Sequence, residues 1–121
     1  LYTWFHDEEY ALAYRWYEDG SVKAAMHKVP RGLYPMSLIA TLNVDLPLMA
    51  SRTNGEVCAM LESGTEVILC ATDDVEWVYI ESLDGSESGW MKAGGEFGME
   101  CYVGEKTMPS YDVFEGLLFA D

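Results

Sequence analysis

The stretch WVYIESLDGSESGWMKAG, residues 77–94, contains the clearest indication of the fold. A run of strand-forming residues is followed by a loop of small and acidic residues, and then by Gly89 and Trp90 side by side. Such loop residues favour a tight turn between two short strands. We expect Gly89 to leave room for another backbone or for the ring of Trp90, and we expect Trp90 to fill the end of a barrel.

Similar signals occur along the rest of the chain. Turn residues separate short alternating segments at the spacing of about 8–12 residues that is typical of all-β domains. The predicted strands are SLIATLNV (37–44), EVCAML (56–61), EVILCAT (66–72), EWVYIES (76–82) and SGWMKA (88–93). The turn ESGT joins the second strand to the third, and Gly64 permits it without steric cost. A small sheet with one buried face tends to close on itself, which removes its exposed edges.

Both ends of the chain differ from this central region. At the N-terminal end, residues 10–29 predict a β-hairpin that turns at Asp19-Gly20. Leu12, Tyr14 and Trp16 share one face of its first strand, and Val22, Ala24 and Met26 can pack beside them across the turn. PRGLYP (30–35) predicts a linker. Near the other end, we expect a short helical turn that Ser110 caps and Gly116 ends, with LLFAD packing back on the barrel.

The charge of the chain limits the partners it can bind. Twenty-one acidic and seven basic residues give a net charge of −14, which repels the phosphates of nucleic acids and anionic membrane surfaces. No apolar run approaches the length of about 20 residues that spans a bilayer. We therefore expect no nucleic acid partner and no membrane insertion. Cationic partners stay open, although we favour the simpler explanation that the charge keeps the domain soluble.

An ordered set of segments resembles a known family. TLNV (41–44) is followed by a long loop through Gly55, the segment EVCAMLESGTEV (56–67), WVYI (77–80) and SGW (88–90). This order resembles the bacterial Src-homology-3-like domains over residues 37–93. The resemblance implies an all-β fold, a small and partly open β-barrel, with an N-terminal β-hairpin extension and linker at residues 1–36. The barrel, with a short C-terminal helical turn in its tail, would occupy residues 37–121.

The chain departs from the family at one loop. Asp45 stands where the family commonly has arginine after Leu-Asn-Val, and LPLMAS (46–51) follows it. The loop is thus more apolar than in the family and lacks that positive charge. The ligands of the family therefore cannot be carried over to this chain.

The resemblance implies a non-catalytic binding module of a larger bacterial extracytoplasmic protein, extracellular or at the cell surface. Its partner would be a peptide, a peptidoglycan fragment or a neighbouring domain of the same protein. The alternative is a structural domain that packs against its neighbour and has no separate ligand. The apolar segment ALAYRWY (11–17) favours this alternative, because it can form an edge of a preceding β domain.

The candidate ligand-binding residues lie on two of the predicted strands and the turn before them. Trp77, Tyr79 and Trp90 can form an aromatic groove, since flat rings offer a large contact area at low entropic cost. Their acidic rim would consist of Asp73, Asp74 and Glu76. For so small a barrel, we favour the alternative that both tryptophans belong mostly to the core. TDDVE (72–76) also lacks the spacing of a calcium loop, so we expect a solvated turn there, with no metal and no cofactor.

Cysteine chemistry is the remaining candidate for catalysis. A cysteine hydrolase needs a thiolate beside a histidine, and both histidines, His6 and His27, are N-terminal. Cys58 and Cys70 lie on neighbouring predicted strands and can be close enough for a disulfide; alternatively, they and Cys101 are small buried hydrophobic residues. We therefore expect a protein that is not an enzyme.

Overall fold

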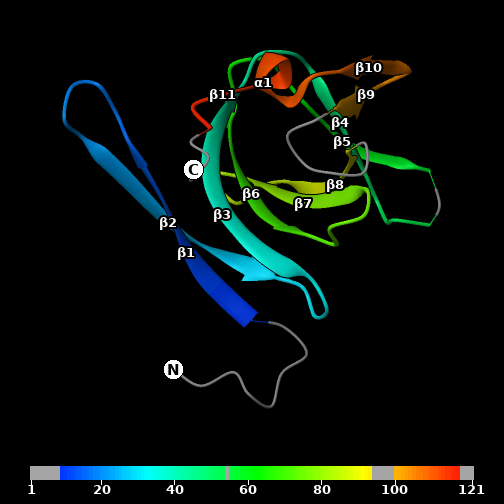
Figure 1. Ribbon diagram of the computed structural model, residues 1–121, viewed down its shortest axis with the longest axis horizontal. Helices are drawn as coiled ribbons and strands as arrows, with labels where there is room; N and C mark the ends of the chain where they lie inside the picture. The colour runs from blue at the N-terminus through cyan, green and yellow to red at the C-terminus, as the bar shows by residue number, and fades with distance from the viewer. Residues whose placement is uncertain (1–8, 54, 94–99, 118–121) are drawn as a thin grey trace.

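Strands dominate the chain in its computed structural model, which describes residues 9–53, 55–93 and 100–117 (Figure 1). The elements in chain order are β1 (Glu9–Trp16), β2 (Val22–Val29), β3 (Tyr34–Leu42), β4 (Leu46–Met49), β5 (Val57–Leu61), β6 (Glu66–Thr72), β7 (Trp77–Ser82), β8 (Ser88–Lys92), β9 (Cys101–Val103), β10 (Lys106–Met108), α1 (Ser110–Val113) and β11 (Phe114–Glu115). The predicted all-β class is confirmed.

One large sheet contains most of these strands. Their order is β2-β1-β3-β6-β7-β8-β4-β5, with β11 pairing beside β3, and β9 and β10 form a separate pair. The sheet is mixed, because β1 meets β3 in parallel at Tyr14 and Leu38 whereas the other pairs are antiparallel. Among the described residues, β2 and β5 end the sheet without pairing with each other. The sheet curves strongly, as Figure 1 shows, but it does not close into a barrel.

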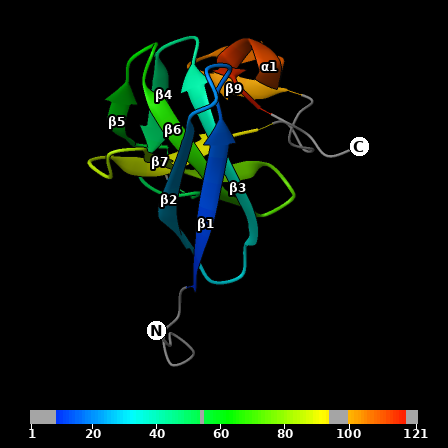
Figure 2. The same ribbon diagram turned by 90° about the vertical axis from the view of Figure 1, so that its left-hand side faces the viewer.

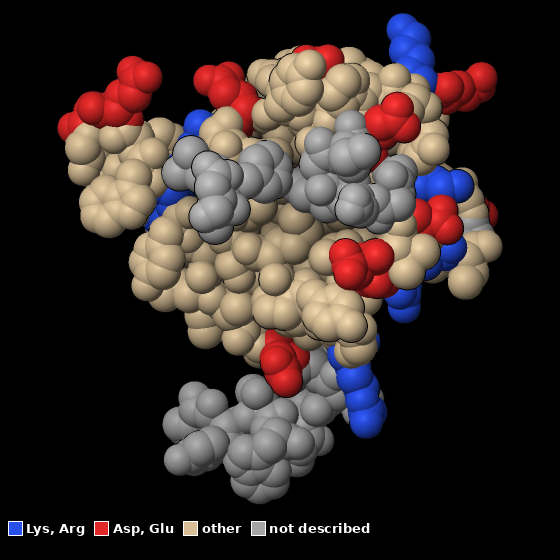
Figure 3. Space-filling view, in the orientation of Figure 1, with Lys and Arg blue, Asp and Glu red and all other residues tan. Residues whose placement is uncertain are grey.

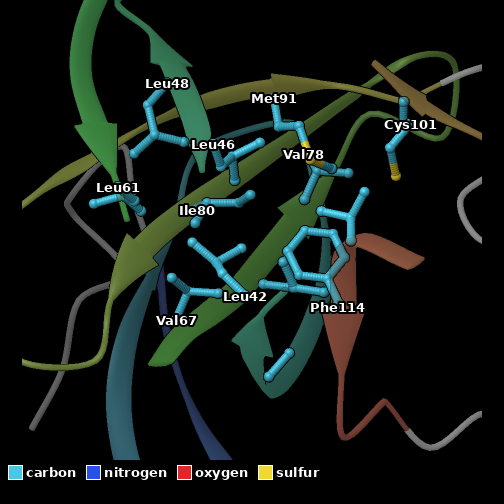
Figure 4. Packing of buried hydrophobic residues seen from close by; sticks show 14 residues of the cluster. Leu42, Leu46, Leu48, Leu61, Val67, Val78, Ile80, Met91, Cys101 and Phe114 are labelled. Carbon is cyan, nitrogen blue, oxygen red and sulfur yellow. The ribbon is translucent and has the colours of Figure 1, made fainter. Parts of the chain in front are cut away.

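The concave side of the curved sheet holds the main core. On β7 the alternation is clear: Val78 and Ile80 are buried, whereas Trp77 and Tyr79 are half-buried on the convex side. Figure 4 shows side chains from β3 to β8, from β11 and from β9 pointing into this core, namely Leu42, Leu46, Leu48, Leu61, Val67, Val78, Ile80, Met91, Cys101 and Phe114. The core therefore needs strands from the whole chain between residues 40 and 114.

Gly89 allows two strands to approach closely, which is one of the two functions expected for it. A Cβ atom at this position would lie 2.7 Å from the Cβ of Leu48 and 2.9 Å from the carbonyl oxygen of Met49, on β4. Trp90 does not fill the end of a barrel, and that expectation was wrong. Buried Gly89 and Met91 take the inward positions of β8, so the side chain of Trp90 lies on the convex face and is half-buried.

The predicted N-terminal hairpin is present, and the face that carries Leu12, Tyr14 and Trp16 points away from the core. Leu12 pairs with Met26, Tyr14 with Ala24 and Trp16 with Val22, and these side chains are exposed. The opposite face carries small residues, including Ala13 and Ala25, which pack against the sheet in a second apolar cluster. The loop between the strands spans residues 17–21, longer than the expected two-residue turn, and Gly20 takes a φ of 91° in it.

A polar cluster holds the turn end of the hairpin against the sheet. The carboxylate of Glu66, on β6, accepts hydrogen bonds from the hydroxyl of Tyr17 and the ammonium of Lys23. Arg15 lies 3.9 Å from the same carboxylate and donates to the hydroxyl of Thr41 on β3 at 2.8 Å. Three side chains of the hairpin region thus converge on one residue of β6.

The predicted pair of strands on either side of ESGT does not form a ladder. β5 pairs with β4, whereas β6 pairs with β3 and β7. Gly64, with a φ of 93°, lets the chain turn a corner here, and its amide donates to the carbonyl of Leu42. β5 and β6 are therefore not neighbours in the sheet. Cys58 on β5 is exposed, Cys70 on β6 is buried, and all three cysteines are free. The candidate disulfide was wrong.

Several elements differ from those predicted from the sequence. β4 lies within the segment assigned to a long loop, and β3 begins at Tyr34, inside the predicted linker. The predicted helical turn does begin at Ser110, but it ends at Val113, before Gly116. Its N-cap position is taken by Pro109, without a side-chain hydrogen bond, and Ser110 is buried inside the turn. Most of LLFAD lies outside the described residues. Across the described ranges, the structure has no helix long and apolar enough to cross a membrane.

Candidate functional site

Trp77, Tyr79 and Trp90 lie on one face of two neighbouring strands. Tyr79 is the register partner of Trp90, and Trp77 is the partner of Lys92. The rings of Tyr79 and Trp90 are in contact, with centroids 5.1 Å apart and planes inclined by 58°. All three side chains are half-buried on the convex side of the sheet. The expectation that the tryptophans belong mostly to the core was therefore wrong.

A small pocket lies beside Trp77. Its volume is about 140 Å³, and it is lined by Pro47, Met49, Trp77, Lys92, Tyr102 and Gly104. The ammonium of Lys92 lies 5.5 Å from the ring centroid of Tyr102 and 3.4 Å from the carboxylate of Glu76. Two aromatic rings, a proline and a methionine thus surround a space with one ion pair at its margin. Such a lining suits a small apolar or planar group with a polar end.

Arg52 covers part of the aromatic face. Its guanidinium lies 4.9 Å from the ring centroid of Trp90, within the range of a cation–π contact. The same guanidinium lies 3.5 Å from the carboxylate of Asp73. Arg52 thus connects the loop after β4 to the turn before β7, across Trp90. Arg52 thus supplies a positive charge in the loop that follows Asp45.

The three acidic residues of the expected rim have different environments. Asp73 is half-buried, and one of its carboxylate oxygens accepts hydrogen bonds from the backbone amides of Val75, Glu76 and Trp77 at 2.9–3.0 Å. Asp74 is exposed, with a φ of 60°, and Glu76 pairs with Lys92. The carboxylate of Asp73 thus stabilises the turn expected at TDDVE. The exposed negative charge of the rim comes mainly from the carboxylate of Asp74.

The contacts of Asp73 also affect its acidity. Burial alone would raise the pKa of this carboxyl group, but the hydrogen bonds from the three backbone amides and the charge of Arg52 favour the ionised form more strongly. The pKa of Asp73 is therefore lowered. An ionised Asp73 keeps the turn and Arg52 in place beside the aromatic face.

The structure brings the predicted aromatic residues together and adds two that the sequence analysis missed. Arg52 and Tyr102 contact the site from the loop after β4 and from β9. Arg52 is the one basic residue of the segment 45–55, which was a signal for it. Tyr102 lies outside the predicted strands, so no local pattern linked it to Trp77. Acidic side chains are scattered over the face of the molecule in Figure 3 and do not gather in one patch there.

The described cysteines and histidine offer little for catalysis. His27 is buried; its Nδ1 donates to the carbonyl of Lys28 at 3.1 Å, and its Nε2 pairs with the hydroxyl of Ser37 at 2.8 Å. Burial raises the pKa of Cys101 to about 12 and that of Cys70 still further, so both thiols stay protonated. His6 lies outside the described residues. Within the described ranges, no group of three potential ligands could hold a metal ion.

No family model matches the chain, and neither a curated protein nor a solved structure matches it.

Proposed function

We propose that this chain is a non-catalytic, Src-homology-3-like binding module of a larger bacterial extracytoplasmic protein, and that its aromatic face recognises a peptide or a cell-wall glycan fragment. The observation that carries the proposal is the pocket beside Trp77. Half-exposed rings on neighbouring strands, next to a small apolar pocket, are the arrangement expected of a site for flat or extended ligands.

The surroundings of the pocket favour a ligand with an amine. Asp74 is exposed in the turn before β7, and Glu76 pairs with Lys92, which lines the pocket. The net charge of −14 attracts cationic groups over longer distances. Amine-bearing peptides and the peptide stems of peptidoglycan both offer such groups. The proposed contact is thus a ring-to-ligand contact at Trp77 and Tyr102 with an acidic margin.

The first prediction is that Trp77→Ala weakens retention on purified peptidoglycan about tenfold or more, as the loss of a central aromatic contact does at protein interfaces. Co-sedimentation of the purified protein with peptidoglycan, at low and at high salt, measures this. Tyr102→Ala should weaken retention as well. This second variant of the pocket tests the site even if Trp77→Ala disturbs the fold. Tyr111→Ala is the matched control, because Tyr111 is exposed and does not line the pocket. If the wild-type protein is not retained at either salt concentration, wall binding is refuted.

A further inference from the structure

The outward face of the N-terminal hairpin is an apolar surface without a cover in the described chain. It consists of Tyr10, Leu12, Tyr14 and Trp16 on β1 and Val22, Ala24 and Met26 on β2; we call it the hairpin face. Trp16 is 68% exposed, Met26 64% and Tyr14 56%. In Figure 2 the hairpin lies nearest the viewer, and no labelled element covers it.

The hairpin has small side chains on its inner face and large side chains on its outer face, which is unusual. Alanines and other residues of the inner face pack against the sheet, whereas the large aromatic side chains point outward. A water-exposed hairpin is expected to place its large apolar residues inward, because burial of apolar area stabilises the fold. The distribution indicates that the outward residues become buried against something else.

The area of the hairpin face is large enough for a stable interface. From the exposed fractions of its side chains and the usual areas of such residues, it offers about 600–700 Å² of apolar surface. The largest apolar patch of a typical monomer is about 300–600 Å². Two such faces in contact bury on the order of 1,200–1,400 Å², which lies within the range of specific interfaces.

Charge favours a second copy of this chain as the occupant. The chain carries a net charge of −14, yet the outward positions of the two strands hold no carboxylate. Lys28, paired with Tyr10, is their one charged residue. A cationic partner would find no opposite charge on this face. Two copies, by contrast, can meet here with their carboxylates elsewhere.

The shape of the hairpin face is complementary to itself. Its β1 row is large throughout, whereas the β2 row is low at Val22 and Ala24. A two-fold axis parallel to the strands places the β1 row of one copy over the β2 row of the other. Because Tyr14 and Ala24 are register partners, this axis sets the tyrosine of each copy over the alanine of the other. We propose that the chain forms a symmetric dimer through the hairpin face.

The dimer is tested by measuring molar mass over a range of protein concentrations with light scattering or sedimentation. We expect a dimer for the wild-type chain, at least a tenfold weaker association for Tyr14→Glu, and no change for Tyr111→Glu, which adds the same charge to another exposed tyrosine, on α1. Added salt should strengthen the dimer, because it screens the repulsion between two acidic chains. A monomer at every concentration, or equal loss in both variants, overturns the proposal and leaves a different protein as the occupant.

A second measurement does not depend on how Tyr14→Glu folds. Two chains are made, Ala24→Cys and Tyr14→Cys, and both carry Cys58→Ser to remove the exposed native thiol. Each chain is oxidised alone, and an equal mixture of the two is oxidised as the third sample. The proposed axis predicts that the mixture forms interchain disulfides faster than either chain alone. Equal rates in the three samples would overturn it.

Discussion

Gly89 shows how one residue controls the approach of two strands. Gly89→Ala places a methyl group against Leu48 and the backbone of Met49, and overpacking of this kind costs about 1–3 kcal/mol. We expect the free energy of unfolding to fall by that amount in urea denaturation. Gly55→Ala is the control, since its Cβ would lie 3.8 Å from the nearest atom, the end of the Met49 side chain. Equal stability of the two variants would contradict the close approach at Gly89.

The contribution of Asp84 to the stability of the fold should depend on pH. Hydrogen bonds from the amide and hydroxyl of Ser86 and the hydroxyl of Ser82 lower its pKa from 3.8 to about 2. A lowered pKa in the folded state means that its contribution to stability is present above about pH 4 and is lost as the pH falls towards 2. Asp84→Asn should therefore flatten the dependence of the urea midpoint on pH between about 4 and 2. An unchanged slope would refute the role of Asp84.

At the scale of elements, Glu66 is the point where the hairpin and the sheet are held together. Glu66→Gln removes the charge that Lys23 and Arg15 face, and partly exposed pairs of this kind contribute about 1 kcal/mol or less. We expect amide hydrogen exchange to become faster in β1 and β2 but not in β7 and β8. Glu62→Gln, at an exposed position, should leave exchange in all four strands unchanged. Uniform acceleration across the sheet would mean that Glu66 stabilises the whole fold and not the hairpin contact.

The sequence predicts most strands of this fold because alternation and turn residues are local signals. β6, β7 and β8 lie where these signals place them, and so do the two arms of the hairpin. β4 was missed because Pro47 and the length of only four residues resemble a loop. The pairing of β5 with β4, and the outward position of Trp90, depend on how distant segments meet, which no local pattern contains. For the same reason, the aromatic residues were predicted as candidates while their neighbours Arg52 and Tyr102 were not.

At the scale of the whole molecule, the net charge acts against the compact state. Fourteen excess negative charges repel one another within the fold. Raising the ionic strength from about 0.01 to 0.15 M shortens the screening length from about 30 to 8 Å, so we expect the melting temperature to rise. The measurement uses Tyr14→Glu, so that a change in dimerisation does not contribute. A fall in melting temperature would show that attractive ion pairs outweigh the repulsion.

The junction between β4 and β8 has a consequence for the order in which the protein folds. The two strands share one pair of register partners, Met49 and Trp90, from distant parts of the chain. Contacts between distant segments form slowly, because the intervening chain must first lose entropy. The β4–β5 pair should thus join the growing structure last, after the consecutive strands β6, β7 and β8 have assembled. This late step should set the overall rate of refolding.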